Sequence, residues 1–99
     1  MITEYLFTGR ENARTGRELA KMLHCNIRDI TASIERERRQ GQPIIASYDP
    51  EQPGYYLAET AEELQRYCSI LEHRAGEMQA TSSILLLTAQ ELPTQEATA

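Results

Sequence analysis

The sequence has few of the residues that build large cores, disulfide frameworks or membrane spans. It contains no tryptophan, one phenylalanine and two cysteines among 99 residues. Cys25 and Cys68 lack the spacing of metal ligands and are too few for a disulfide framework, so we interpret both as small apolar side chains. No apolar run approaches the roughly 20 residues that cross a bilayer, and no signal-peptide pattern opens the chain. We therefore expect a cytoplasmic protein with one domain, no metal and no membrane role.

Catalytic sets are also missing from the chain. No Ser/His/Asp or Cys/His spacing indicates nucleophilic catalysis, and no glycine-rich loop would cradle a phosphate. The acids of residues 60–92 are spread in a way that is typical of a solvated surface. The sequence thus predicts a protein that is not an enzyme, needs no cofactor and has no evident small-molecule ligand.

The charge is divided unevenly between the two halves of the chain. The net charge is −5, which by itself argues against nucleic acid. Residues 1–41, however, carry eight arginines and lysines against six acids, whereas residues 42–99 carry two against nine. A basic first half on an acidic protein is consistent with nucleic-acid binding by that half and with another task for the second.

Residues 26–41 predict a helix with one apolar edge and one basic edge. Asn26 can cap its start, and Gly41 can end it in a left-handed conformation. At about 100° per residue, one side carries Ile27, Ile30, Thr31 and Ile34. The opposite side carries Arg28, Asp29, Ala32, Arg36 and Arg39. Arginines around a small alanine suit the major groove, because arginine reads guanine edges and alanine permits close approach. A solvated helix laced with Glu–Arg pairs is the alternative, and this stretch alone does not decide between them.

A shorter helix precedes this one. Thr15 and Glu18 have the spacing of a capping box, which predicts a helix that begins there and ends near His24. Arg17 and Lys21 lie one turn apart on its outer side, where they would either contact phosphates or simply be solvated. Two helices joined by such a tight corner form a helix-turn-helix unit.

The pattern after Gly41 changes from helical to extended. Residues 43–48 and 55–57 are predicted to be strands, and residues 49–54 form a turn with two prolines, so a β-hairpin follows the basic helix. Adjacent residues of a strand point to opposite faces, so one of Tyr55 and Tyr56 is expected to pack inward and the other to face outward. For the tyrosine that faces outward, packing against the last helix is favoured over contact with a sugar-phosphate.

Residues 60–92 predict a long helix that begins at a capping box of Thr60 and Glu63 and is stopped by Pro93. Large residues recur every seven positions, and small residues follow each of them four positions later. These seam residues are Leu64, Cys68, Leu71, Ala75, Met78, Ser82, Leu85 and Ala89. Unbroken, the helix would extend roughly 45 Å, which is longer than a small domain can cover. We expect it to form a homodimer. Folding back on its own domain, a break at residues 81–83, or pairing with another protein are the alternatives.

Residues 15–57 resemble a winged helix-turn-helix DNA-binding domain. The residues that carry the resemblance are Arg17-Glu18-Leu19-Ala20-Lys21, Leu23, Arg28, Ile34, Gly41, Ile44 or Ile45, and Gly54-Tyr55-Tyr56-Leu57. Their order and spacing are similar to the N-terminal domain of the biotin operon repressor and to small regulators of phages and mobile elements. The resemblance implies a mainly α fold with a small β-hairpin wing (α+β), followed by the long C-terminal helix. It also implies a DNA contact by residues 26–39.

Three positions depart from the pattern of that family. His24 stands at the corner that glycine often occupies, and histidine tolerates positive φ better than most residues. Glu37 replaces the usual leucine, so we expect the end of this helix to be less buried than normal. Asp49 and Glu51 occupy the wing tip, where acids repel phosphate, so we expect a weak backbone contact there.

The sequence therefore predicts a sequence-specific DNA-binding protein, a small dimeric transcriptional regulator of phage or mobile-element type. The expected contacts to double-stranded DNA are Arg17, Lys21, Asn26, Arg28, Asp29, Thr31, Ala32, Arg36 and Arg39. Arg38 is expected to pair with Glu35 or with an acid of the last helix. Residues 1–58 would form the winged domain, 59–92 the C-terminal helix and 93–99 a disordered tail. A protein-interaction module, or an accessory factor of phage replication or recombination, is the alternative function.

Overall fold

Two units make up the chain, and each is described by itself. The structure is a computed structural model that describes residues 1–94, so the last part of the predicted tail, residues 95–99, lies outside the described residues. The first unit is Met1–Tyr67, and the second begins at Cys68. The chain is mainly α-helical with one two-stranded hairpin, which confirms the predicted fold class.

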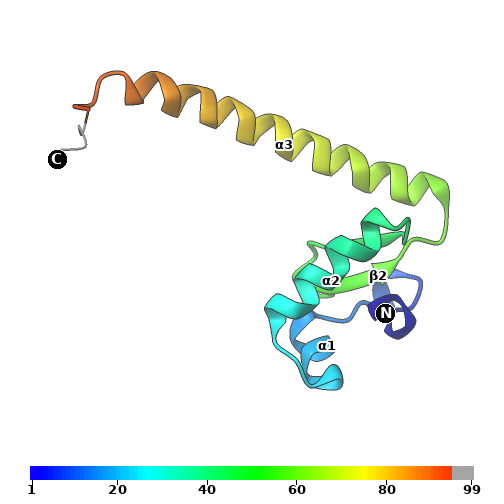
Figure 1. The fold of residues 1–99 in the computed structure, drawn as a ribbon. Helices are drawn as coiled ribbons and strands as arrows, with labels where there is room; N and C mark the ends of the chain where they lie inside the picture. The colour runs from blue at the N-terminus through cyan, green and yellow to red at the C-terminus, as the bar shows by residue number, and fades with distance from the viewer. Residues whose placement is uncertain (95–99) are drawn as a thin grey trace. The chain divides into compact units, whose positions relative to one another are not determined.

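The first unit contains the predicted pair of helices, α1 (Gly16–Leu23) and α2 (Ile27–Arg39), joined by a short corner (Figure 1). Capping boxes begin both helices, because Thr15 and Asn26 each accept a bond from a backbone N–H three residues later. His24 ends α1 in the left-handed region, with φ 53° and ψ 46°. Gly41 follows α2 with φ 97°. The local signals at both ends of both helices are thus confirmed.

A β-hairpin follows α2, as predicted. Its strands are β1 (Ile44–Ser47) and β2 (Gly54–Leu57), which pair antiparallel with Ile45 opposite Tyr56. Arg14, just before α1, adds a further bridge by exchanging two backbone hydrogen bonds with Tyr55, at 2.9 and 2.7 Å. Gly54 sits at this crossing with φ 121°, and a Cβ there would overlap the backbone of Arg14. The hairpin is therefore tied to the start of α1 as well as to the end of α2.

Apolar side chains cover both faces of the hairpin. One face joins the main core, which contains Ile2, Leu6, Leu19, Ala20, Ile30, Ile34 and Ile44. The N-terminal 3-10 turn, Ile2–Tyr5, supplies the first of these residues. The other face holds a second cluster of Ile45, Tyr56 and Tyr67. Tyr55 packs against the main core while Tyr56 packs in the second cluster. The favoured prediction for the outward tyrosine is therefore confirmed, because Tyr56 packs against Tyr67 of the last helix.

Helix α3 (Ala61–Ala89) begins inside the first unit. The Thr60 hydroxyl accepts a bond from the Glu63 N–H at 3.2 Å, as a capping box requires. The Glu63 carboxylate accepts from the Glu59 N–H instead of closing the box on Thr60. Tyr67 is buried in the second cluster and is the last residue of the first unit.

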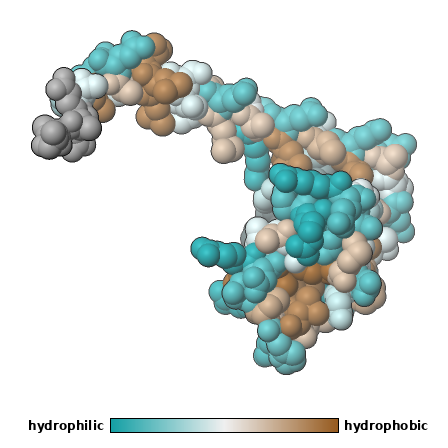
Figure 2. All heavy atoms as spheres, in the orientation of Figure 1, coloured by the Kyte–Doolittle hydropathy of each residue, from teal (hydrophilic) through white to brown (hydrophobic). Residues whose placement is uncertain are grey.

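The helix continues through residues 81–83 without a break and ends four residues before Pro93. Every residue from Cys68 to Thr94 is exposed, including a run of apolar side chains near the end of the helix (Figure 2). Among the described residues, no helix combines the length and the apolar character needed to cross a membrane.

Candidate nucleic-acid interface

The inner face of α2 fixes which side chains the helix presents to solvent. Ile30 and Ile34 are only 1% and 2% exposed and lie in the main core. Residues halfway around the helix from them must therefore face outward. All nine residues predicted to contact DNA are exposed: Arg17, Lys21, Asn26, Arg28, Asp29, Thr31, Ala32, Arg36 and Arg39.

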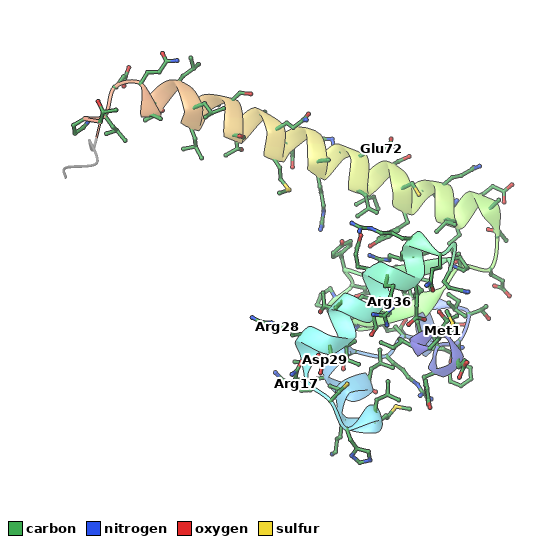
Figure 3. All side chains as sticks on the ribbon, viewed as in Figure 1. Met1, Arg17, Arg28, Asp29, Arg36 and Glu72 are labelled. Atoms are coloured by element: carbon green, nitrogen blue, oxygen red, sulfur yellow. The ribbon has the colours of Figure 1, made fainter. Side chains whose placement is uncertain are left out.

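The cations of this surface differ in their partners. Within residues 1–94, no hydrogen bond or ion pair engages the side chains of Arg17, Lys21 or Arg28. Figure 3 shows Arg17 and Arg28 projecting from the same edge of the first unit. Arg36 donates to the Ser33 hydroxyl at 3.1 Å, which leaves its charge uncompensated. Arg39, in contrast, lies 3.3 Å from the Glu35 carboxylate.

The acids among these cations serve local structure. Glu18 accepts bonds from the N–H and the hydroxyl of Thr15, and Asp29 accepts a long one of 3.5 Å from the Asn26 N–H. The Asn26 side chain accepts from the Asp29 N–H at 2.8 Å, so its oxygen is already engaged in capping. Acids in the first turn also favour helix formation, because the amino end of a helix carries partial positive charge. These residues therefore have structural roles whether or not DNA is bound.

Two further predicted residues lie on the outer surface of α2 beside the arginines. The Thr31 hydroxyl donates to the Ile27 carbonyl oxygen at 3.1 Å, which turns it back along its own helix. Ala32 exposes only a methyl group, so the helix backbone is accessible at this point. The centre of the outer face of α2 therefore carries short side chains and is flanked by longer cationic ones.

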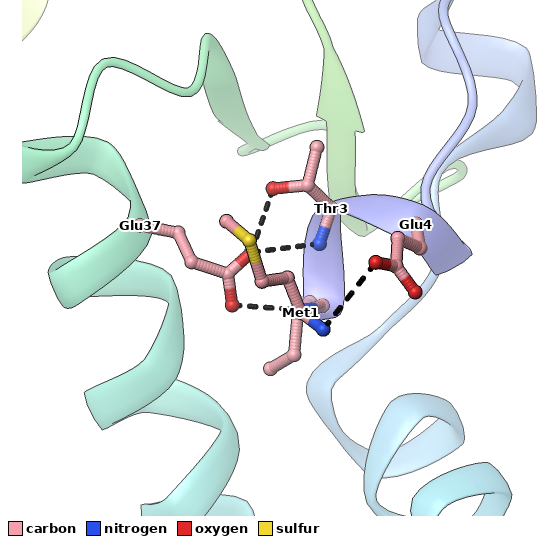
Figure 4. A network of polar contacts seen from close by, with 5 residues as sticks. Met1, Thr3, Glu4 and Glu37 are labelled. Atoms are coloured by element: carbon pink, nitrogen blue, oxygen red, sulfur yellow. Dashed lines mark hydrogen bonds and ion pairs between the residues drawn. The ribbon is translucent and has the colours of Figure 1, made fainter.

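Glu37 corrects the expectation that the end of α2 is poorly buried. It is 1% exposed, and its carboxylate accepts bonds from the Ile2 N–H, the Thr3 N–H and the Thr3 hydroxyl at 2.7–2.8 Å (Figure 4). Burial raises the pKa of this carboxyl, but the three hydrogen bonds and the nearby N-terminal amine together hold it below its usual value. A charged residue thus fills the position of the expected leucine, because the N-terminal turn offers it unpaired backbone donors.

Arg38 also departs from its predicted pairing. Its guanidinium donates to the Ile44 carbonyl oxygen and to the Tyr67 hydroxyl, both at 3.0 Å, and lies 5.4 Å from the centre of the tyrosine ring. Glu35 faces away from this contact and pairs with Arg39. Arg38 therefore connects α2 to β1 and to the beginning of α3, a role that sequence reasoning missed because nothing local points to Tyr67.

The contact between the hairpin and α1 includes a second arginine that the sequence did not single out. Arg14 donates to the Met22 sulfur at 3.2 Å and lies 4.9 Å from the centre of the Phe7 ring. The hairpin tip carries Asp49 and Glu51 and no cation, and the Glu51 N–H donates to the Asp49 carboxylate. The tip is thus acidic, whereas the outer face of α1 and α2 is basic.

Among residues 1–94, no three His, Cys, Asp or Glu side chains are grouped so that they could hold a metal ion. Comparisons of the chain with protein-family models, with curated proteins and with solved structures found no match. The exposed basic face of α1 and α2 and the exposed apolar side chains of α3 are the surface features from which a function is inferred.

Proposed function

We propose that this chain is a winged helix-turn-helix protein that binds double-stranded DNA with the outer face of α2. The observation that carries the proposal is the set of exposed, unpaired cations Arg17, Lys21 and Arg28 on a pair of helices whose inner faces are fixed by buried aliphatic side chains. We further propose that it is a small transcriptional regulator of the cytoplasm and not an enzyme.

The two helices would divide the work of binding. Arg28 and Arg36 lie on the outer face of α2 and would reach guanine edges or phosphates in the major groove, with Ala32 allowing close approach. Arg17 and Lys21 lie on α1 and would hold phosphates, which positions the protein without reading sequence. Asn26, Asp29 and Thr31 would contribute mainly by shaping the helix, because their polar atoms already have local partners.

Two copies would act together through α3. The seam residues from Leu71 onward are exposed, whereas Leu64 packs against the second cluster of its own unit. A pair of α3 helices would join two copies of α2, so the preferred DNA site would have two-fold symmetry. Sedimentation equilibrium of the full chain should find a dimer, and a monomer at every concentration would remove this part of the proposal.

The acidic hairpin tip favours a rival function. Asp49 and Glu51 would repel a phosphate backbone, and the Glu35–Arg39 pair reduces the positive charge near the end of α2. Such a surface suits a winged-helix module that binds a protein with a basic patch, for example an accessory factor in replication or recombination. The rival predicts no selection of a DNA sequence by this chain.

Selection of a site from random duplexes, followed by binding assays with variants, separates the two functions. Arg28→Ala should weaken binding to the selected site by about 1–3 kcal/mol for each base that the arginine reads. Arg66→Ala is the matched control, because it removes an exposed arginine from another helix. Arg17→Ala should weaken all duplexes similarly and reduce the salt slope by about 1. No selected site, or equal affinities of the Arg28 and Arg66 variants, would contradict the DNA proposal.

A further inference from the structure

We infer that the second copy lies antiparallel along α3, with Ala80 at the midpoint of the pair. This inference rests on the proposed homodimer and adds its direction and register. The facing residues within α3 would be Leu71 with Ala89, Ala75 with Leu85, and Met78 with Ser82 of the second copy. Each of these pairs joins one large and one small side chain.

The free part of α3 requires a partner. Met78, Leu85 and Leu86 of α3 expose between 62% and 73% of their surface. Helices in water are stabilised mainly by packing of an apolar face, and an exposed apolar strip of this length is unusual on a monomer. Gly76 and the weak helix formers at 81–83 make this segment still more dependent on packing. The helix is nevertheless continuous over this region.

The alternation of side-chain size selects the direction. In a parallel pair, equal positions face each other, so layers of two leucines would alternate with layers of two small residues. Those small layers, such as Ala75 against Ala75, would leave gaps once the leucine layers set the distance between the helices. In an antiparallel pair each large residue faces a small one, so every layer has a similar volume and the helices can approach evenly. Even filling is favoured because voids forfeit dispersion contacts.

Charge and burial select the register. In an antiparallel pair, a residue that flanks the seam on one side faces a residue that flanks it on the same side of the partner helix. Arg74 and Thr88 flank one side of the seam, and Glu72 and Leu86 flank the other. A midpoint at residue 73 would thus bring Arg74 against Arg74 and Glu72 against Glu72, and such like charges repel. With the midpoint at Ala80, Arg74 meets Thr88 and Glu72 meets Leu86, which are both uncharged.

A midpoint between residues 76 and 77 would require the second copy to cover Leu64, which already packs against the second cluster. A midpoint between residues 83 and 84 would leave Leu71 uncovered.

Cysteine cross-linking tests the direction, because the chain has only two cysteines. Cys25→Ala leaves Cys68 alone. In the antiparallel pair the two copies of Cys68 would lie about 36 Å apart, far beyond the roughly 7 Å Cα separation that a disulfide tolerates. The Cys25→Ala protein should therefore stay uncrosslinked under mild oxidation.

A cysteine pair placed within α3 gives the positive test of the same arrangement. Leu71→Cys/Ala89→Cys, in a background without Cys25 and Cys68, should cross-link two chains when each single variant does not, with helicity checked by circular dichroism. Disulfides joining Cys68 to Cys68 would indicate a parallel pair and overturn the inference, as would a monomer in sedimentation. Cross-linking as expected in a protein without DNA affinity would refute only the DNA proposal. Conversely, DNA binding by a parallel pair would refute only the antiparallel arrangement.

Discussion

Replacing Glu37 tests whether a buried carboxylate holds the N-terminal turn against α2. The side chain accepts three hydrogen bonds from Ile2 and Thr3 and is 1% exposed. Glu37→Gln keeps the shape but turns one accepting oxygen into an NH₂ group that faces donors. A hydrogen bond to a charged group contributes about 1.5–3 kcal/mol, and a stranded buried donor costs about 1–3 kcal/mol. We expect the variant to lose about 2–4 kcal/mol, a large share of the roughly 5 kcal/mol available to a small domain.

This loss should depend on pH. Burial raises the pKa of Glu37, but the bonds from Thr3 and Ile2 outweigh it and hold the folded-state value below the usual one. A carboxyl of this kind stabilises the fold fully above its unfolded-state pKa, about 4.3, and loses that contribution as the pH falls through the folded-state value. The stability difference between wild type and Glu37→Gln should thus be constant near neutral pH and shrink below about pH 4.

Urea unfolding followed by tyrosine fluorescence is a suitable assay. All five tyrosines lie within residues 1–67, so the signal reports on the first unit. Glu35→Gln is the matched control, since it removes the same charge from an exposed position of α2 whose ion pair contributes less than about 1 kcal/mol. A Glu37→Gln protein as stable as wild type at pH 7, or a deficit that does not shrink in acid, would refute the reasoning.

Three further substitutions test other contacts of the first unit by the same unfolding assay. Gly54→Ala should destabilise it by at least about 2 kcal/mol, because its Cβ would overlap the backbone of Arg14 at a positive φ; a stable variant would refute the close crossing. Tyr67→Phe should cost about 1 kcal/mol by removing the bond from Arg38, and no loss would mean that this bond is unimportant. His24→Gly should stabilise by about 0.5–1 kcal/mol, because glycine adopts the left-handed corner without strain; a less stable variant would contradict this.

Signals that act within a few residues were readable from the sequence. The capping residues Thr15 and Asn26, the left-handed corner at His24 and the hairpin all form where the spacing placed them. The reason is that a cap or a turn is satisfied by neighbours three or four positions away, so its partner is visible in the same stretch of chain. Helical periodicity also placed the arginines of α2 on its exposed side, but Ile27 and Thr31, which it put on the apolar edge, are exposed as well.

Contacts between distant segments were not readable. Glu37 looked like an unfavourable replacement for leucine, because the two backbone donors that it satisfies lie 34 and 35 positions away at the N-terminus. Arg38 was expected to find an acid, yet it bonds to Tyr67, 29 positions later. The periodicity of a helix predicts which of its sides is buried, but it does not predict which polar group of a distant segment lies against that side.

The sequence by itself determined the order of the helices and strands, the ends of α1 and α2 and the outward direction of Arg28, Arg36 and Arg39, since these depend on backbone geometry and on the period of a single helix. Only the tertiary structure decided that Glu37 joins α2 to the N-terminus and that Arg38 joins it to β1 and to the start of α3. Those decisions required the packing of segments far apart in the chain, where burial gives a polar side chain either a partner or a penalty.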